Sequence, residues 1–165
     1  MNIESLTKLE SRIEDRMPKS GTFEERHKFL EGNGIYQEWR GLFEKYSELA
    51  FSGDIEALKR TLFFIWYQCS EPNQLSGLNK LDEKITEKVL REIDSLVELN
   101  KLDNELEFML PYYFQVCEWY FERFNKLNAL SKASKIKSEL WQVEAPKCKW
   151  LSRGRMGEYW SSKGL

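Results

Sequence analysis

The stretch LFFIWYQC, residues 62–69, begins with six apolar or aromatic side chains in succession, in a chain of 165 residues of which 32% are charged. On a helical wheel at ~100° per residue, these side chains cover both sides of a helix instead of one stripe. One side holds Ile55, Leu58, Leu62, Ile65, Trp66 and Cys69, and the other holds Phe63, Phe64 and Tyr67. Because a helix that is apolar nearly all round is a buried one, we expect a central helix over about 54–70.

A second stretch, PYYFQVCEWYFERF at 111–124, has the same character. Its apolar and aromatic side chains sweep more than half of the helical circumference, which predicts a second interior helix over about 111–127, packed on the first. Trp66 and Trp119 are therefore expected to be deeply buried core residues. Pro111 lies inside a helical pattern that begins near Asp103, and it predicts a kink or a restart at that point.

The remaining pattern is also helical, with Gly and Pro at the breaks. Helices are expected over about 4–16, 22–32, 35–50, 81–100 and 128–141, and Thr22 with Glu25 forms a capping-box pattern at the start of the second. The sequence thus predicts an all-α fold, a single bundle-like domain of about six or seven helices over 1–145. An irregular, basic, aromatic tail over 146–165 is expected to pack on that domain.

The net charge of −2 is unevenly distributed. Residues up to Asn125 include 16 Lys and Arg against 24 Asp and Glu, a net −8, whereas residues from Lys126 onward include 9 against 3, a net +6. An acidic body attracts a basic tail and repels a polyanion. The charge division therefore favours a tail that lies across its own domain, and a nucleic-acid or membrane partner is the alternative interpretation.

The cysteines and the N-terminal residues indicate a soluble, cytoplasmic protein. Cys69, Cys117 and Cys148 are odd in number and far apart, which favours free thiols in a reducing compartment over a disulfide framework. The sequence begins MNIESLTKLE, which lacks the apolar segment of a secretory signal. The longest apolar run is far shorter than the ~20 residues that span a bilayer, so no membrane partner is expected.

Patterns typical of metal, cofactor and catalytic sites are weak. The single histidine, His27, forms an i,i+3 pair with Glu24, but the second such pair that di-iron bundles need has no histidine to complete it. Gly32 and Gly34 lack the strand and the Lys-Ser/Thr ending of a phosphate-binding loop. The sequence therefore predicts no metal, no cofactor and no catalytic residue, and it favours a protein that is not an enzyme.

A candidate small-ligand site lies at the end of the helix over about 54–70. Glu71 stands just before Pro72, at the helix end where its negative charge opposes the macrodipole. An aromatic wall with a few polar groups at its mouth is typical of a ligand pocket. The candidate ligand-binding residues are Trp66, Tyr67, Glu71, Asn73 and Gln74, and a solvated loop is the alternative interpretation.

The tail sequence, PKCKWLSRGRMGEYWSSKGL at 146–165, interleaves basic and aromatic side chains. This composition suits single-stranded nucleic acid, through phosphate contacts and base stacking, and equally a tail that docks on its own domain. We expect the second arrangement, with Trp150 and Trp160 shielded. The candidate tail interaction residues are Trp150, Arg153, Arg155, Tyr159 and Trp160.

Taken together, small size, an acidic body, surplus aromatics and no catalytic constellation favour a non-catalytic protein-binding module. An antitoxin- or immunity-type neutraliser or an adaptor is the expected class, with another protein as partner and a homo-oligomer as a further option. The first alternative is a small-ligand-binding protein or enzyme that uses the Trp66–Glu71 region. The second is a nucleic-acid binder that uses the tail.

Overall fold

The computed structural model describes residues 2–124, 126–131 and 146–164, and among these it contains helices and no β-strand. The all-α, bundle-like fold is confirmed. The helices are α1 (Ile3–Glu14), α2 (Phe23–Gly32), α3 (Ile35–Phe51), α4 (Ile55–Ser70), α5 (Asn73–Ser76), α6 (Glu83–Glu98), α7 (Asn104–Phe121), the 3₁₀ helix η1 (Glu122–Phe124) and α9 (Gly154–Ser162). Residues 128–131 are also helical, and the rest of the helix expected over about 128–141 lies outside the described residues.

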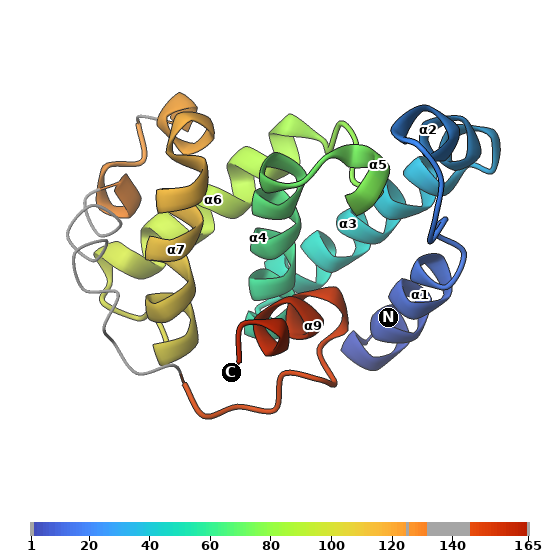
Figure 1. Ribbon diagram of the computed structural model, residues 1–165. Coiled ribbons are helices and arrows are strands. Elements are labelled where there is room, and N and C mark those ends of the chain that lie inside the picture. Colours follow the sequence, from blue (N-terminus) through green and yellow to red (C-terminus); the bar gives the residue numbers. More distant parts are fainter. Residues whose placement is uncertain (1, 125, 132–145, 165) are drawn as a thin grey trace.

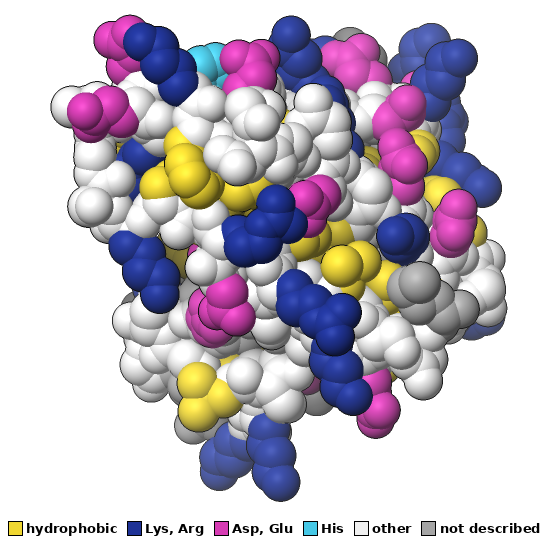
Figure 2. Space-filling model, turned by 90° about the vertical axis from the view of Figure 1, so that its right-hand side faces the viewer, with side chains coloured by type: hydrophobic (Ala, Val, Ile, Leu, Met, Phe, Trp, Pro, Cys, Tyr) yellow, Lys and Arg dark blue, Asp and Glu magenta, His cyan; other side chains and the backbone are white. Residues whose placement is uncertain are grey.

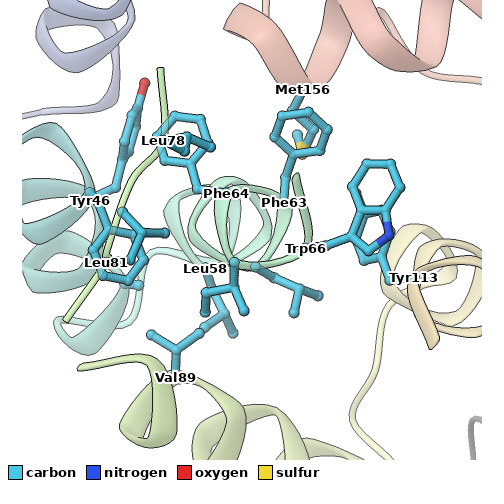
Figure 3. Packing of buried hydrophobic residues seen from close by; sticks show 14 of the residues in the cluster. Tyr46, Leu58, Phe63, Phe64, Trp66, Leu78, Leu81, Val89, Tyr113 and Met156 are labelled. Atoms are coloured by element: carbon cyan, nitrogen blue, oxygen red, sulfur yellow. The ribbon is translucent and has the colours of Figure 1, made fainter. Parts of the chain in front are cut away.

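Helix α4 is the centre of the bundle, as its sequence predicts. It packs against α3, α5, α6 and α7, and every residue from Ala57 to Trp66 is buried. Figure 3 shows side chains leaving it in several directions: Phe64 lies toward Tyr46, Phe63 toward Met156 and Trp66 toward Tyr113. A helix surrounded in this way needs apolar side chains on all sides, which explains the LFFIWYQC stretch.

Helix α7 is the second interior helix, but one prediction about it is wrong. Trp66 is 1% exposed, whereas Trp119 is 63% exposed. The backbone of Cys117 leaves the helical region, at φ −128° and ψ 39°. This changes the angular phase of the residues that follow, so Tyr120 and Phe121 are buried and Trp119 faces outward. The helix continues through Pro111, and its non-helical residue lies six positions later.

The C-terminal segment is also more ordered than its sequence predicts. Gly154–Ser162 forms the helix α9, so the tail is not irregular throughout. Two glycines and the absence of a side-chain N-cap argue against a helix here. Because a short helix gains its stability mainly from packing, contacts with α1, α4 and α7 override this weak local preference.

Candidate functional site

Residues 146–164, here called the tail, lie against a surface built from three helices. We define the tail-binding surface by Glu10 and Glu14 on α1, Glu56 on α4, and Glu105 and Tyr113 on α7. All five side chains hydrogen-bond to the tail. Figure 1 shows α9 beside α1 and in front of α4. Four carboxylates on the body therefore face the basic tail, in agreement with its opposite charge.

Arg153 links the tail to α4 and α7. Its Nε donates to Glu56 Oε1 at 2.9 Å, and its Nη2 donates to Glu56 Oε2 and to Glu105 Oε2, the latter at 2.7 Å. Lys59 also donates to Glu105 Oε2, at 2.7 Å, and Arg60 to Glu56 Oε1, at 2.8 Å. Burial and surrounding carboxylates make this a desolvated ion network and not a set of surface pairs.

Arg155 links the tail to α1 and α5. Its backbone N–H donates to Glu10 Oε1 at 2.7 Å, and its guanidinium donates to Glu14 and to the Ser76 carbonyl. The guanidinium carbon also lies 4.1 Å from the centre of the Trp39 ring, a cation–π distance. Each side of this guanidinium thus meets a group of the body, which fixes the position of α9.

Aromatic contacts also hold α9 against the body of the protein. Trp160 is 1% exposed, and its Nε1 donates to Tyr113 Oη at 3.2 Å. The centre of the Tyr159 ring lies 5.0 Å from that of Trp66, and the two hydroxyls of Tyr159 and Tyr112 are hydrogen-bonded. Trp150 is 3% exposed and lies against Trp160. The shielding expected for Trp150 and Trp160 is therefore present.

Glu10 is a buried carboxylate on the face of α1 that also carries Leu6 and Ile13. Its two oxygens accept hydrogen bonds from the Arg155 backbone N–H and, at 2.7 Å, from the Tyr46 hydroxyl. Burial raises the pKa of Glu10 above its ordinary value, and these hydrogen bonds offset the rise only in part. Glu10 is not among the predicted site residues, although a glutamate in register with the apolar face of a helix is a detectable signal.

Glu105 shows the opposite balance. Burial alone would raise its pKa, but the hydrogen bonds from Arg153 and Lys59 outweigh that effect and lower the pKa below its ordinary value. Arg153, held by Glu56 and Glu105, has its own pKa raised despite its burial. The charged forms of these residues are therefore mutually stabilised, and neither is poised to exchange protons near neutral pH.

Two glycines of α9 are required by close approach. Gly154 has φ +59°, and a Cβ there would overlap the carboxylate of Glu10. A Cβ at Gly157 would overlap the backbone carbonyl oxygen of Trp150. The glycines that weaken the helical propensity of this segment are thus the residues that let it reach the body and fold back on itself.

The predicted ligand-binding residues are only partly brought together. Trp66 is buried in the aromatic core, with its ring stacked on Tyr113 at 4.7 Å between centres. Glu71 is the C-cap of α4, and Asn73 and Gln74 begin α5, all three half-buried. Of the five predicted residues, only Tyr67 lines a cavity of about 200 Å³. The other residues that line it are Glu14, Leu75, Arg155, Glu158, Tyr159 and Ser162. The cavity therefore belongs to the junction with α9.

The outward side of α7 is a separate exposed apolar feature. We call Val116 and Trp119 the outer face of α7; they are 45% and 63% exposed. Glu118 and Glu122 beside them are exposed carboxylates. Because Trp is enriched at protein interfaces, an exposed Trp next to an exposed Val makes this side of α7 a candidate contact surface.

The groups with potential metal or nucleophilic chemistry are engaged or protonated. His27 Nδ1 lies 3.0 Å from the Tyr36 hydroxyl, and Glu24 pairs with Lys28. Burial raises the pKa of Cys69 to about 12 and that of Cys117 to about 11, so neither thiol is a thiolate near neutral pH. Within residues 2–124, 126–131 and 146–164, no group of three or more His, Cys, Asp or Glu could hold a metal ion.

Charges of both signs alternate on the face that Figure 2 shows, on the side of α1 and α2, without a continuous basic surface. No helix in the described part of the chain has the length and apolar character to cross a membrane. Comparison with known protein families, curated proteins and solved structures finds no match for this chain.

Proposed function

We propose that the protein is a non-catalytic protein-binding module that uses the outer face of α7. The observation that carries this proposal is the 63% exposure of Trp119, on a helix whose six other aromatic side chains are all buried or half-buried. Trp is among the residues most enriched at the energetic centre of interfaces. The neutraliser and adaptor classes both fit a small binding module of this kind. A cytosolic location belongs to the same proposal, and the free thiols of Cys69, Cys117 and Cys148 favour it.

The expected partner is a protein with an apolar pocket and a basic rim. Trp119 and Val116 would fill the pocket, while Glu118 and Glu122 would face Lys or Arg side chains at the edge. Such an arrangement places the desolvated contacts at the centre and the charges where they steer association. A second copy of the chain is a less favoured partner, because it would bring its own Glu118 and Glu122 to an edge where a basic rim is expected.

The test is affinity purification of native complexes with three forms of the protein. Wild type, Trp119→Ala and Leu99→Ala are compared by quantitative mass spectrometry. Leu99 is a matched control because it is an apolar side chain of similar exposure, 60%, and is the C-cap of α6, outside α7. A partner retained by Leu99→Ala and lost by Trp119→Ala supports the proposal. Identical sets of retained proteins for all three forms would contradict it.

A nucleic-acid-binding role for the tail is the alternative that the ion pairs oppose. Arg153 and Arg155 are engaged with carboxylates of the body, so neither guanidinium is free to contact a phosphate. Lys147, Lys149 and Lys163 remain exposed, which leaves a weak basic surface. The small-ligand alternative rests on the cavity beside Tyr67, whose volume of about 200 Å³ is below the ~300–1,000 Å³ of typical ligand sites.

A further inference from the structure

We propose that the tail can be exchanged between two copies of this chain, so that each copy seats its residues 146–164 on the tail-binding surface of the other. This inference concerns a surface distinct from the outer face of α7 and does not rest on the proposed function. The occupant of the surface is known from the structure, because the chain's own tail already fills it. A second copy carries the identical segment.

The tail behaves as a contiguous ligand. Its contacts with the tail-binding surface come from Arg153, Arg155 and Trp160, which lie within eight consecutive positions. The partners of these residues are distant in sequence, at separations of 97 residues for Glu56 and 145 for Glu10. Contacts of this kind depend on the surface being filled and not on which chain fills it, which is the basis of domain swapping.

Chemical recognition on this surface is specific. The two arginines are separated by one glycine, and each inserts between carboxylates: Arg153 meets Glu56 and Glu105, and Arg155 meets Glu10 and Glu14 through its backbone and side chain. A surface without a tail lacks the hydrogen bond from the Arg155 backbone N–H to Glu10 and the contact between the Arg155 guanidinium and Glu14. The tail of a second copy that reaches this surface restores both contacts.

Mass action decides which tail is bound. The chain's own tail has an effective concentration that is commonly in the mM range for a short connection, so the monomer dominates in dilute solution. The exchanged dimer keeps the contacts that residues 146–164 make with the tail-binding surface, so the balance between the two forms depends on protein concentration. Refolding at high concentration therefore favours exchange, because unfolded tails then meet both surfaces.

The primary experiment refolds the full chain from urea at protein concentrations from about 1 µM to about 1 mM. Size-exclusion chromatography with light scattering then measures the dimer fraction after dilution. We expect a dimer whose fraction rises with refolding concentration, falls at least ~10-fold in Arg153→Glu/Arg155→Glu and is unchanged in Trp119→Ala. A monomer at every concentration, or a dimer equally abundant in the charge-reversed variant, would overturn the proposal. A dimer lost only in Trp119→Ala would assign it to the outer face of α7.

A second measurement keeps the test decisive if the doubly reversed variant does not fold. A fluorescent synthetic peptide of residues 146–164 is titrated into full-length Gly157→Ala, in which overlap of the new Cβ with the Trp150 carbonyl is expected to weaken the binding of the chain's own tail while the body keeps its sequence. Peptide binding at least ~10-fold tighter than to wild type is expected, and the Arg153→Glu/Arg155→Glu peptide serves as the control. Equal affinity for both proteins, or for both peptides, would overturn the proposal.

Discussion

At the scale of single residues, Trp66 and Trp119 show where helical periodicity predicts burial correctly and where it does not. Both lie in apolar stretches, and a helical wheel predicts that both are buried in the core. The wheel assumes a constant angle per residue, and Cys117 breaks that assumption just before Trp119. Periodicity therefore predicted the environment of Trp66 and could not predict that of Trp119, because no residue in the stretch signals non-helical angles at Cys117.

The two tryptophans should differ sharply on substitution. Trp66→Ala is expected to lower the free energy of unfolding by ~3–5 kcal/mol, because it empties a fully buried site. Trp119→Ala is expected to change it by no more than ~0.5 kcal/mol, since the side chain is 63% exposed. Urea unfolding followed by far-UV circular dichroism measures both. A large loss for Trp119→Ala would show that it supports the fold.

Gly157 and Gly41 form a second contrast at this scale. Gly157→Ala is expected to lower the free energy of unfolding by ~1–3 kcal/mol, because its Cβ overlaps the Trp150 carbonyl oxygen. Gly41→Ala, in the interior of α3 with open space around the added Cβ, is expected to raise it by up to ~1 kcal/mol. Equilibrium unfolding in urea gives both values, and effects of the same sign would contradict this account of α9.

At the scale of elements, helix starts are the features that the sequence predicted best. Thr22, Asp54, Asp82 and Asp103 are N-caps whose side chains accept from the backbone N–H three residues on. Helix α9 has no such cap and two glycines, and its helical state depends on a surface assembled from residues about 50 to 145 positions earlier. Local pattern reasoning does not include that surface, so the helix and its carboxylate partners were missed.

Glu10 on α1 and Glu105 on α7, which both contact the tail, should make opposite contributions to the pH dependence of the free energy of unfolding. Glu10 has a raised pKa, so its contribution to the free energy of unfolding falls as pH rises above the ordinary carboxyl value of 4.5. Glu105 has a lowered pKa, so its stabilisation is present above 4.5 and is lost as pH falls through its folded-state pKa. Ionisation of Glu10 therefore lowers the free energy of unfolding, whereas ionisation of Glu105 raises it.

This prediction is tested with Glu10→Gln and Glu105→Gln, unfolded in urea between about pH 3 and pH 7. Relative to Glu10→Gln, wild type should lose stability as pH rises. Relative to Glu105→Gln, it should gain stability over the acidic part of the range. Differences that change in the same direction for both variants would contradict the assigned shifts in pKa.

At the scale of the whole molecule, the tail is predicted to be part of the fold and not an appendage. A chain that ends at Ala145 loses the buried side chains of Trp150, Met156 and Trp160. It also loses hydrogen-bond partners of Glu10 and Tyr113. We expect the free energy of unfolding to fall by more than ~3 kcal/mol, as for the loss of one large core side chain or more.

Thermal melts of the full and shortened chains measure this loss. A titration with a single-stranded oligonucleotide at two salt concentrations accompanies the melts. An unchanged melting temperature together with salt-sensitive, tail-dependent binding would favour the nucleic-acid role instead. A lowered melting temperature without binding is the expected result.

The distance in sequence between Glu10 and Arg155 also has a consequence for synthesis of the protein in the cell. At ~5–20 residues per second, a ribosome adds Arg155 roughly 7–30 s after Glu10, because 145 positions separate them. Until the tail is added, Glu10, Glu14, Glu56 and Glu105 lack the hydrogen bonds that Arg153 and Arg155 supply, and Tyr113 lacks its contact with Trp160. Chaperones that hold hydrophobic or acidic segments therefore have their best opportunity before translation reaches α9, and slow codons ahead of it would lengthen that interval.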